Sequence, residues 1–115
     1  MTITRSDMNH RRSRIVTHGD TIYLSGMVAP DTDGDMTHQA KAVMAHIDTT
    51  LAQAGSDKSK ILSATIWIKT MNDFKAFNAV WDTWIDPENP PARACGEVRM
   101  AREEILVEII IVAAK

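Results

Sequence analysis

Arg93 is one of two charged residues whose type and position could support chemistry on a small substrate. It follows the loop Pro90-Pro91-Ala92 and opens a β-prone run in which it alternates with Cys95, Glu97 and Arg99. A guanidinium fork can hold a planar carboxylate through two parallel hydrogen bonds. We therefore expect Arg93 to bind a substrate carboxylate, and the plainer alternative is a solvated charge on an edge strand.

Glu108 is the second such residue, because it interrupts an apolar strand. Strand parity places it on the same face as Leu106, Ile110 and Val112. A buried carboxylate is costly unless it is paired or protonated. Two interpretations remain open: a structural ion pair with an arginine, or a carboxylate that exchanges protons with substrate or water. Since the strand of Arg93 directly precedes that of Glu108, we expect the two side chains to lie near each other.

Other signatures of chemistry are absent from the sequence. It contains no Gly-rich phosphate loop, no metal-spaced histidine or cysteine cluster and no nucleophile elbow. Among the four histidines, only His38 and His46 share a predicted element. Cys95 has no evident activating base, so we expect a small buried hydrophobe rather than a nucleophile. The sequence therefore predicts no metal site.

The elements that must position these residues begin with short β-prone segments. Residues 2–5 could form an edge strand, whereas residues 6–13 show no clear period and suggest an arm or loop. The runs 15–17 and 21–25 flank the turn His18-Gly19-Asp20, which predicts a β-hairpin.

An amphipathic helix is predicted next, over residues 36–54. Asp35 can act as its N-cap and Gly55 as its stop signal. The spacing of the apolar residues gives the helix over residues 36–54 one hydrophobic face. A β-rich run follows the helix at residues 61–68.

A second amphipathic helix is predicted to begin after a cap at Asn72 or Asp73 and to end at the prolines that start with Pro87. The remainder reads as strands over residues 92–100 and 105–113, joined by a short charged turn. The order of elements is therefore β-β-β-α-β-α-β-β.

Two helices with one apolar face each suit one side of a mixed sheet, which is the α+β class with a two-layer sandwich. We expect residues 1–115 to form one domain. The last strand is apolar on both sides, so both of its faces should be buried. The sheet face away from the helices then needs a partner, which indicates self-association.

Charge and composition limit the classes of partner. The net charge is −2, with 13 basic and 15 acidic residues well mixed, so no footprint for nucleic acid or an anionic membrane is visible. No apolar run reaches the roughly 20 residues that span a bilayer, and the polar N-terminus is unlike a signal sequence. We expect a cytoplasmic protein, in agreement with its single cysteine.

Four short segments together resemble the YjgF/RidA family of reactive-intermediate (enamine and imine) deaminases, and more closely its YoaB-type members. The resemblance covers nearly the whole chain. Its carriers, in the family's order, are Thr21-Ile22-Tyr23-Leu24-Ser25-Gly26, Asn72-Asp73-Phe74 with Asn78, Pro91-Ala92-Arg93-Ala94-Cys95, and Val107-Glu108-Ile109 with Val112-Ala113.

The resemblance implies a chorismate-mutase-like fold, a homotrimer with three clefts between subunits, and no metal or organic cofactor. Arg93 would bind the carboxylate of a small substrate, and Glu108 would position or activate water. The cleft would also be lined by Ser25, Gly26, Asn78 and Cys95.

The chain departs from the family at Arg12, where deaminating members carry a tyrosine. The Leu-Pro pair that usually follows the Arg strand is also replaced, by Met100-Ala101. If Arg12 reaches the cleft of Arg93, two cations converge there and favour a second carboxylate on the ligand. The alternative is a mobile basic arm with Arg11 and Arg14.

The first functional hypothesis is hydrolysis of small 2-imino or enamine acids to 2-oxo acids and ammonia. The second is a non-catalytic or regulatory module that binds a carboxylate metabolite in the same cleft. Ribonuclease or translation-inhibiting activity, also attached to the family, finds no basic patch in this sequence.

Overall fold

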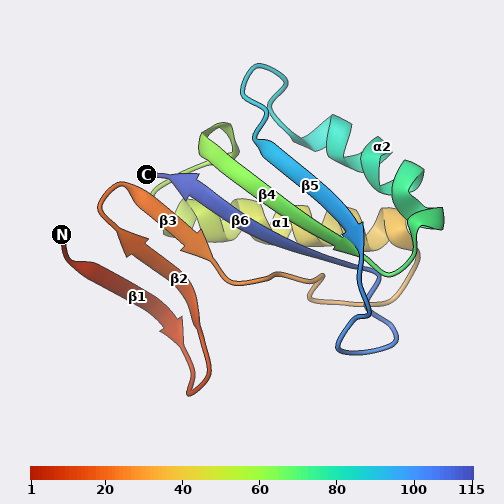
Figure 1. Cartoon of the computed structure of the whole chain (residues 1–115), viewed down its shortest axis with the longest axis horizontal. Helices are drawn as coiled ribbons and strands as arrows, with labels where there is room; N and C mark the ends of the chain where they lie inside the picture. Colours follow the sequence, from red (N-terminus) through yellow and green to blue (C-terminus); the bar gives the residue numbers. More distant parts are fainter.

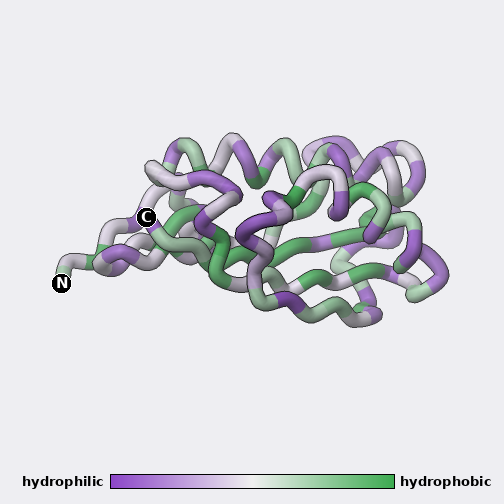
Figure 2. The backbone as a smooth tube through the Cα atoms, turned by 90° about the horizontal axis from the view of Figure 1, so that it is seen from above, coloured by the Kyte–Doolittle hydropathy of each residue, from purple (hydrophilic) through white to green (hydrophobic).

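In the computed structural model, which describes residues 1–115, two helices pack on one face of a six-stranded sheet (Figure 1). Figure 2 shows the two layers edge-on, with the helices along one side of the sheet. The α+β sandwich and its order of elements are thereby confirmed. The strands and helices are β1 Ile3–Met8, β2 Ser13–His18, β3 Thr21–Leu24, α1 Met36–Gln53, β4 Ile61–Ile68, α2 Phe74–Trp84, β5 Ala92–Glu97 and β6 Val107–Ala114.

The sheet is mixed, with strand order β1-β2-β3-β6-β4-β5. All neighbours are antiparallel except β4 and β5, which run parallel because α2 forms the crossover between them. The last two strands do not pair, and they are not joined by the predicted short turn, because β5 ends at Glu97 and β6 begins only at Val107. The connection 98–106 passes the end of β4, so that β6 lies between β3 and β4 while β5 forms the edge.

The first helix begins and ends as predicted. The Asp35 carboxylate accepts a hydrogen bond from the His38 backbone N–H, and Gly55 follows the C-cap with φ +81°. The second helix differs, because Asp73 occupies its N-cap position without a side-chain hydrogen bond. A 3₁₀ turn over Met71–Asp73 precedes it, and the Thr70 side chain caps that turn.

The first strand is longer than predicted. Residues predicted as an arm extend β1 to Met8, where its end pairs with Ser13 of β2. Every residue of β1 is exposed, so its sequence carries no alternation of apolar and polar residues. The strand is defined by its backbone hydrogen bonds to β2, which a single-sequence pattern does not reveal.

One face of β6 forms the centre of the hydrophobic core. Val107, Ile109 and Ile111 are fully buried beneath the helices. Their neighbours on the other face, Ile110 and Val112, are only half-buried in one copy of the chain. The prediction that both faces are buried thus holds for one face, and the other is open to a partner. No helix is both long enough and apolar enough to span a membrane.

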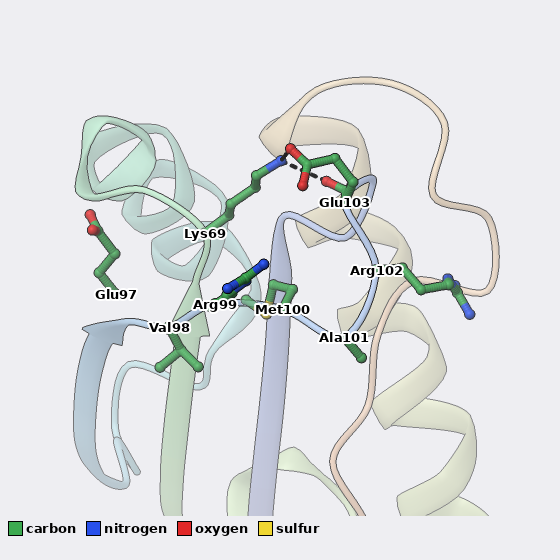
Figure 3. A pocket seen from close by; sticks show the side chains of 8 residues that line it. All are labelled: Lys69, Glu97, Val98, Arg99, Met100, Ala101, Arg102 and Glu103. Carbon is green, nitrogen blue, oxygen red and sulfur yellow. Dashed lines mark hydrogen bonds and ion pairs between the residues drawn. The ribbon is translucent and has the colours of Figure 1, made fainter.

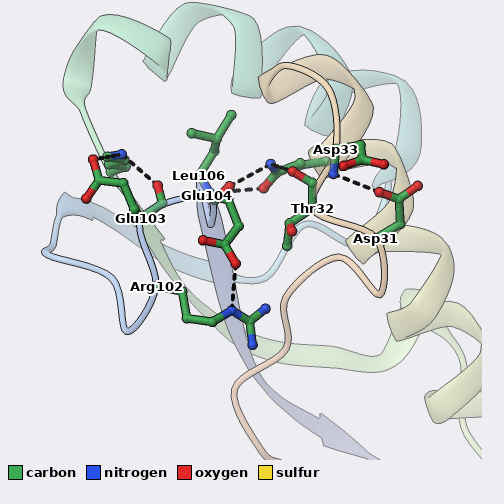
Figure 4. Close-up of polar contacts among 9 residues, drawn as sticks. Asp31, Thr32, Asp33, Arg102, Glu103, Glu104 and Leu106 are labelled. Carbon is green, nitrogen blue, oxygen red and sulfur yellow. Dashed lines mark hydrogen bonds and ion pairs between the residues drawn. The ribbon is translucent and has the colours of Figure 1, made fainter.

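Gln39 ties three segments together at one end of the sheet. Its side chain is 1% exposed, and Nε2 donates to the carbonyl oxygens of Thr32 and Glu104, each at 2.9 Å. Its Oε1 accepts from the Leu106 N–H at 2.9 Å. Figure 4 shows Thr32, Glu104 and Leu106 gathered at this point. The amide thereby anchors the connection 98–106, which delivers the chain to β6.

We expect Gln39→Leu to destabilise the fold by roughly 2–4 kcal/mol, because three backbone groups lose their partners in a buried place. Chemical denaturation measures the change. The matched control is Gln53→Leu, at an exposed position of the same helix, which should change stability by less than about 0.5 kcal/mol. Equal effects of the two substitutions would contradict an anchoring role for Gln39.

Candidate functional site

Arg93 lies on the edge strand β5 and points to the helix-covered side of the sheet. Its guanidinium donates to the Asn78 side-chain oxygen at 2.5 Å. The same group lies 5.0 Å from the centre of the Trp81 ring and 5.8 Å from that of Phe77. Such aromatic faces attract a cation. One amide and two rings of α2 therefore orient the fork, whose remaining donors have no partner in the chain.

Cys95 follows Arg93 on the same face of β5 and is half-buried. Burial raises the pKa of the Cys95 thiol, and the positive charge of Arg93 offsets only part of that effect. The thiol is therefore protonated at neutral pH and contacts the core as a small apolar group. This agrees with the prediction that Cys95 is no activated nucleophile.

Glu108 lies on the open face of the sheet, in the half-buried row of β6. Its carboxylate lies directly against Gly26. A Cβ atom at residue 26 would come within 2.1 Å of the Glu108 Oε2 atom, so only glycine leaves room for the carboxylate in this position. Gly26 is thus part of the setting of Glu108.

A bulge after β3 brings Ser25 and Gly26 to this place. Tyr23 pairs with Val112 and Met27 with Ile109, so four residue steps on one strand face three on the other. The extra residue bends the strand and redirects its side chains. Ser25 also pairs with β2, because its N–H donates to the Arg14 carbonyl at 3.0 Å.

The expectation that Arg93 and Glu108 lie near each other is wrong for a single copy of the chain. Strand β4 separates their strands, and Arg93 pairs with Ala64 whereas Glu108 pairs with Trp67. Those two β4 residues are three positions apart, so Arg93 and Glu108 point to opposite faces. The predicted site residues thus form two half-sites: Arg93, Asn78 and Cys95 on the helix-covered side, and Ser25, Gly26 and Glu108 on the open side.

Arg12 lies in the turn just before β2, outside the open-face half-site. Its guanidinium donates to the Asp7 carbonyl at 2.6 Å and is 4.0 Å from the Asp7 carboxylate. Two residues along, the Arg14 guanidinium is 3.5 Å from the Ser25 hydroxyl.

Sequence reasoning missed Arg14, although pairing of the two strands of the hairpin could have indicated it. It also missed the contact of Trp81 with Arg93, although Trp81 lies one helical turn after Asn78.

The largest hollow on the surface is elsewhere, over the connection between β5 and β6. It has a volume of about 430 Å³. Figure 3 shows Lys69 and Glu103 at its rim, joined by an ion pair of 2.8 Å, and Arg99 in the middle. None of the predicted site residues lines it. No three His, Cys, Asp or Glu side chains gather closely enough anywhere to hold a metal ion.

The fold defines the protein as a two-layer α+β sandwich with an edge-strand arginine and a carboxylate on the opposite sheet face. The family model described as Endoribonuclease L-PSP matches residues 2–115. The chain belongs to this family, which includes the YjgF and RutC proteins, and the resemblance seen in the sequence is confirmed.

Two relatives and one solved structure match over nearly their full length. The RutC family protein YoaB of Escherichia coli K12 is 40% identical over 114 residues, which cover 99% of both chains. A RutC family protein of Haemophilus ducreyi is 39% identical over 97% of this chain and 96% of its own. The crystal structure of a YjgF-family protein from Neisseria meningitidis is similar with a TM-score of 0.97 and 42% identity, over 100% of this chain and 96% of that one.

We expect Gly26→Ala to move the Glu108 carboxylate away from the Ser25–Gly26 bulge, because the new methyl group and Oε2 cannot both fit. The matched control is Gly96→Ala on β5, where a Cβ atom meets nothing within 4 Å. Gly96→Ala should stabilise the fold by about 0.4–1 kcal/mol through lower entropy of the unfolded chain. Gly26→Ala should lose that gain. Denaturation and a crystal structure of each variant measure both effects, and an unmoved Glu108 would contradict the close approach.

Proposed function

We propose that this chain hydrolyses small 2-imino and enamine acids to 2-oxo acids and ammonia, in clefts between the subunits of a homotrimer. The observation that carries the proposal is the oriented guanidinium of Arg93, which keeps free donors for a planar carboxylate. Membership of the YjgF and RutC family supports it.

The opposite orientation of the two half-sites supports a site between subunits. Arg93, Asn78 and Cys95 of one copy would face Ser25, Gly26 and Glu108 of the next. The open face of the sheet, with half-buried Ile110 and Val112, is an apolar surface suited to such a contact. A cleft of this kind is completed only by association, as expected for a chain too small to enclose a deep pocket.

Each residue then has a defined part in the reaction. Arg93 binds the substrate carboxylate and so fixes the direction of the C=N bond. A water oxygen adds to the imine carbon while Glu108 accepts a proton from that water, and the imine nitrogen takes up one proton from solvent. Glu108 then returns its proton to the amino nitrogen of the resulting carbinolamine. Ammonia leaves, the hydroxyl proton passes to solvent, and the C=O bond of the 2-oxo acid forms. Cys95, protonated and half-buried, lines the wall.

The same Arg93 geometry favours a second candidate, a non-catalytic module that binds a carboxylate metabolite. Such a module needs Arg93 but no group that transfers protons, so Glu108 separates the two functions. Ribonuclease activity, named in the description of the family model, is less favoured by this chain. Its net charge is −2, and RNA binding relies on basic or aromatic surfaces.

We expect a trimer at micromolar concentration, with a mass in light scattering three times that of the chain. Ile110→Arg, which puts a charge on the open face, should shift the protein toward monomers. Ala45→Arg, on the exposed side of α1, is the control and should leave the trimer intact. A dominant wild-type monomer would leave the cleft without its second wall and would refute both candidate functions.

Arg93→Lys should lower kcat/KM for imine hydrolysis roughly 10- to 100-fold, almost as much as Arg93→Ala. Lysine keeps the charge but loses the two-point hydrogen bonding to a carboxylate and the contact of the guanidinium with the Trp81 ring. Substrates are 2-imino acids formed in situ, and the assay follows the loss of the imine. The exposed Arg99→Lys is the control and should behave as wild type. Near-normal activity of Arg93→Lys would reduce Arg93 to an edge charge.

Glu108→Gln should lower kcat by about 10²–10⁴-fold if the carboxylate transfers protons, with little effect on the binding of a 2-oxo acid. Calorimetric titration measures that binding. If wild type never exceeds the uncatalysed rate, and Glu108→Gln binds 2-oxo acids as wild type does, the binding module replaces the enzyme.

A further inference from the structure

Arg14 is a cation beside Ser25 of the open-face half-site, and the proposed reaction does not use it. It lies on β2 directly opposite Ser25, whose N–H donates to the Arg14 carbonyl. Its side chain is only 22% exposed, and its one hydrogen bond, to the Ser25 hydroxyl, is long at 3.5 Å. A guanidinium carries five donors, so most of those on Arg14 have no partner in the chain.

The charge of Arg14 is only partly balanced. Asp7 is shared between two arginines, since its carboxylate lies 3.6 Å from Arg14 and 4.0 Å from Arg12. Both distances exceed a hydrogen bond. The one hydrogen bond between Arg12 and Asp7 goes from the Arg12 guanidinium to the Asp7 backbone carbonyl, at 2.6 Å. One carboxylate therefore faces two cations, and an excess positive charge remains beside Ser25.

The free donors of Arg14 are accessible. No nitrogen or oxygen of a side chain is both fully buried and without a hydrogen-bond partner. The unpaired nitrogens of Arg14 therefore reach solvent, although most of the side chain is covered. A largely covered cation whose unpaired donors touch solvent can bind an anion at a small entropic cost, because its stem is already held in place.

Arg14 also adjoins the residues expected to act on the imine. The Ser25 hydroxyl that it contacts belongs to the bulge whose next residue, Gly26, touches Glu108. A ligand atom between Arg14 and Glu108 thus lies over the bulge. In the proposed trimer Arg93 of another copy would reach this cleft, so the two guanidinium groups would stand on opposite walls.

We propose that Arg14 binds a second carboxylate of the ligand, so that the preferred substrates are 2-imino diacids. Arg93 holds the carboxylate next to the imine carbon, and Arg14 holds the distal one. This inference rests on the proposed function, because it assigns the substrate class of the same cleft. It differs from the expectation for Arg12, whose closest donor is used within its own hairpin.

The test compares a diacid with a monoacid of similar length, as imines formed in situ from glutamate and from norvaline. Wild type should have the higher kcat/KM on the diacid. Arg14→Gln should lower kcat/KM on the diacid roughly 10- to 100-fold and change the monoacid value by less than about threefold. Arg14→Lys should recover part of the preference. The control for net charge is Arg102→Gln, which removes an exposed arginine of the connection 98–106, outside both half-sites.

Two results would overturn the inference: a wild type that hydrolyses the monoacid as well as the diacid, or an Arg14→Gln variant with an unchanged preference. A preference lost in Arg12→Gln and kept in Arg14→Gln would assign the second carboxylate to Arg12. If wild type hydrolyses neither imine, the proposed function fails by itself. Calorimetry then measures the affinities of wild type and Arg14→Gln for 2-oxoglutarate, a diacid, and 2-oxopentanoate, a monoacid. A preference for the diacid that is present in wild type and lost in Arg14→Gln supports the role of Arg14. Equal affinities of wild type for the two acids refute it.

Discussion

The two helices cover only one face of the sheet, and the rest of the molecule depends on this asymmetry. Side chains alternate along each strand, so every strand in the middle of the sheet presents one row to the core and one row to the outside. On β6 the inner row is Val107, Ile109 and Ile111, while Glu108 belongs to the outer row. A carboxylate can stand in an apolar strand because its row is not sealed by the helices.

The position of β4 between β5 and β6 has an equally direct consequence for chemistry. Arg93 faces α2, where Asn78 and Trp81 hold its guanidinium, and this contact needs the parallel crossover that brings α2 over the edge strand. Glu108 faces the other way. The two side chains therefore lie on different surfaces of one copy, and the proposed trimer would bring them together. Under that proposal, a variant that no longer assembles would also lose its activity.

The bulge at Ser25–Gly26 links the N-terminal hairpin to this arrangement. It brings the bare backbone of Gly26 to Glu108 and the hydroxyl of Ser25 to Arg14, its cross-strand partner. The first hairpin is thus more than a cover for the edge of the sheet. Its residues Asp7, Arg12 and Arg14 leave an excess of positive charge beside the bulge, which is the basis of the proposed role in the choice of ligand.

The sequence by itself determined the α+β class, the order of elements, the bounds of α1 and the family, because these rest on local periodicity, capping residues and short motifs. It also singled out Arg93 and Asn78, which the fold joins by a hydrogen bond. It did not determine the length of β1, which has no apolar alternation, or the placement of β6 beside β4. Only the tertiary structure decided that Arg93 and Glu108 face opposite ways, because strand order and register arise from long-range pairing that no local pattern encodes.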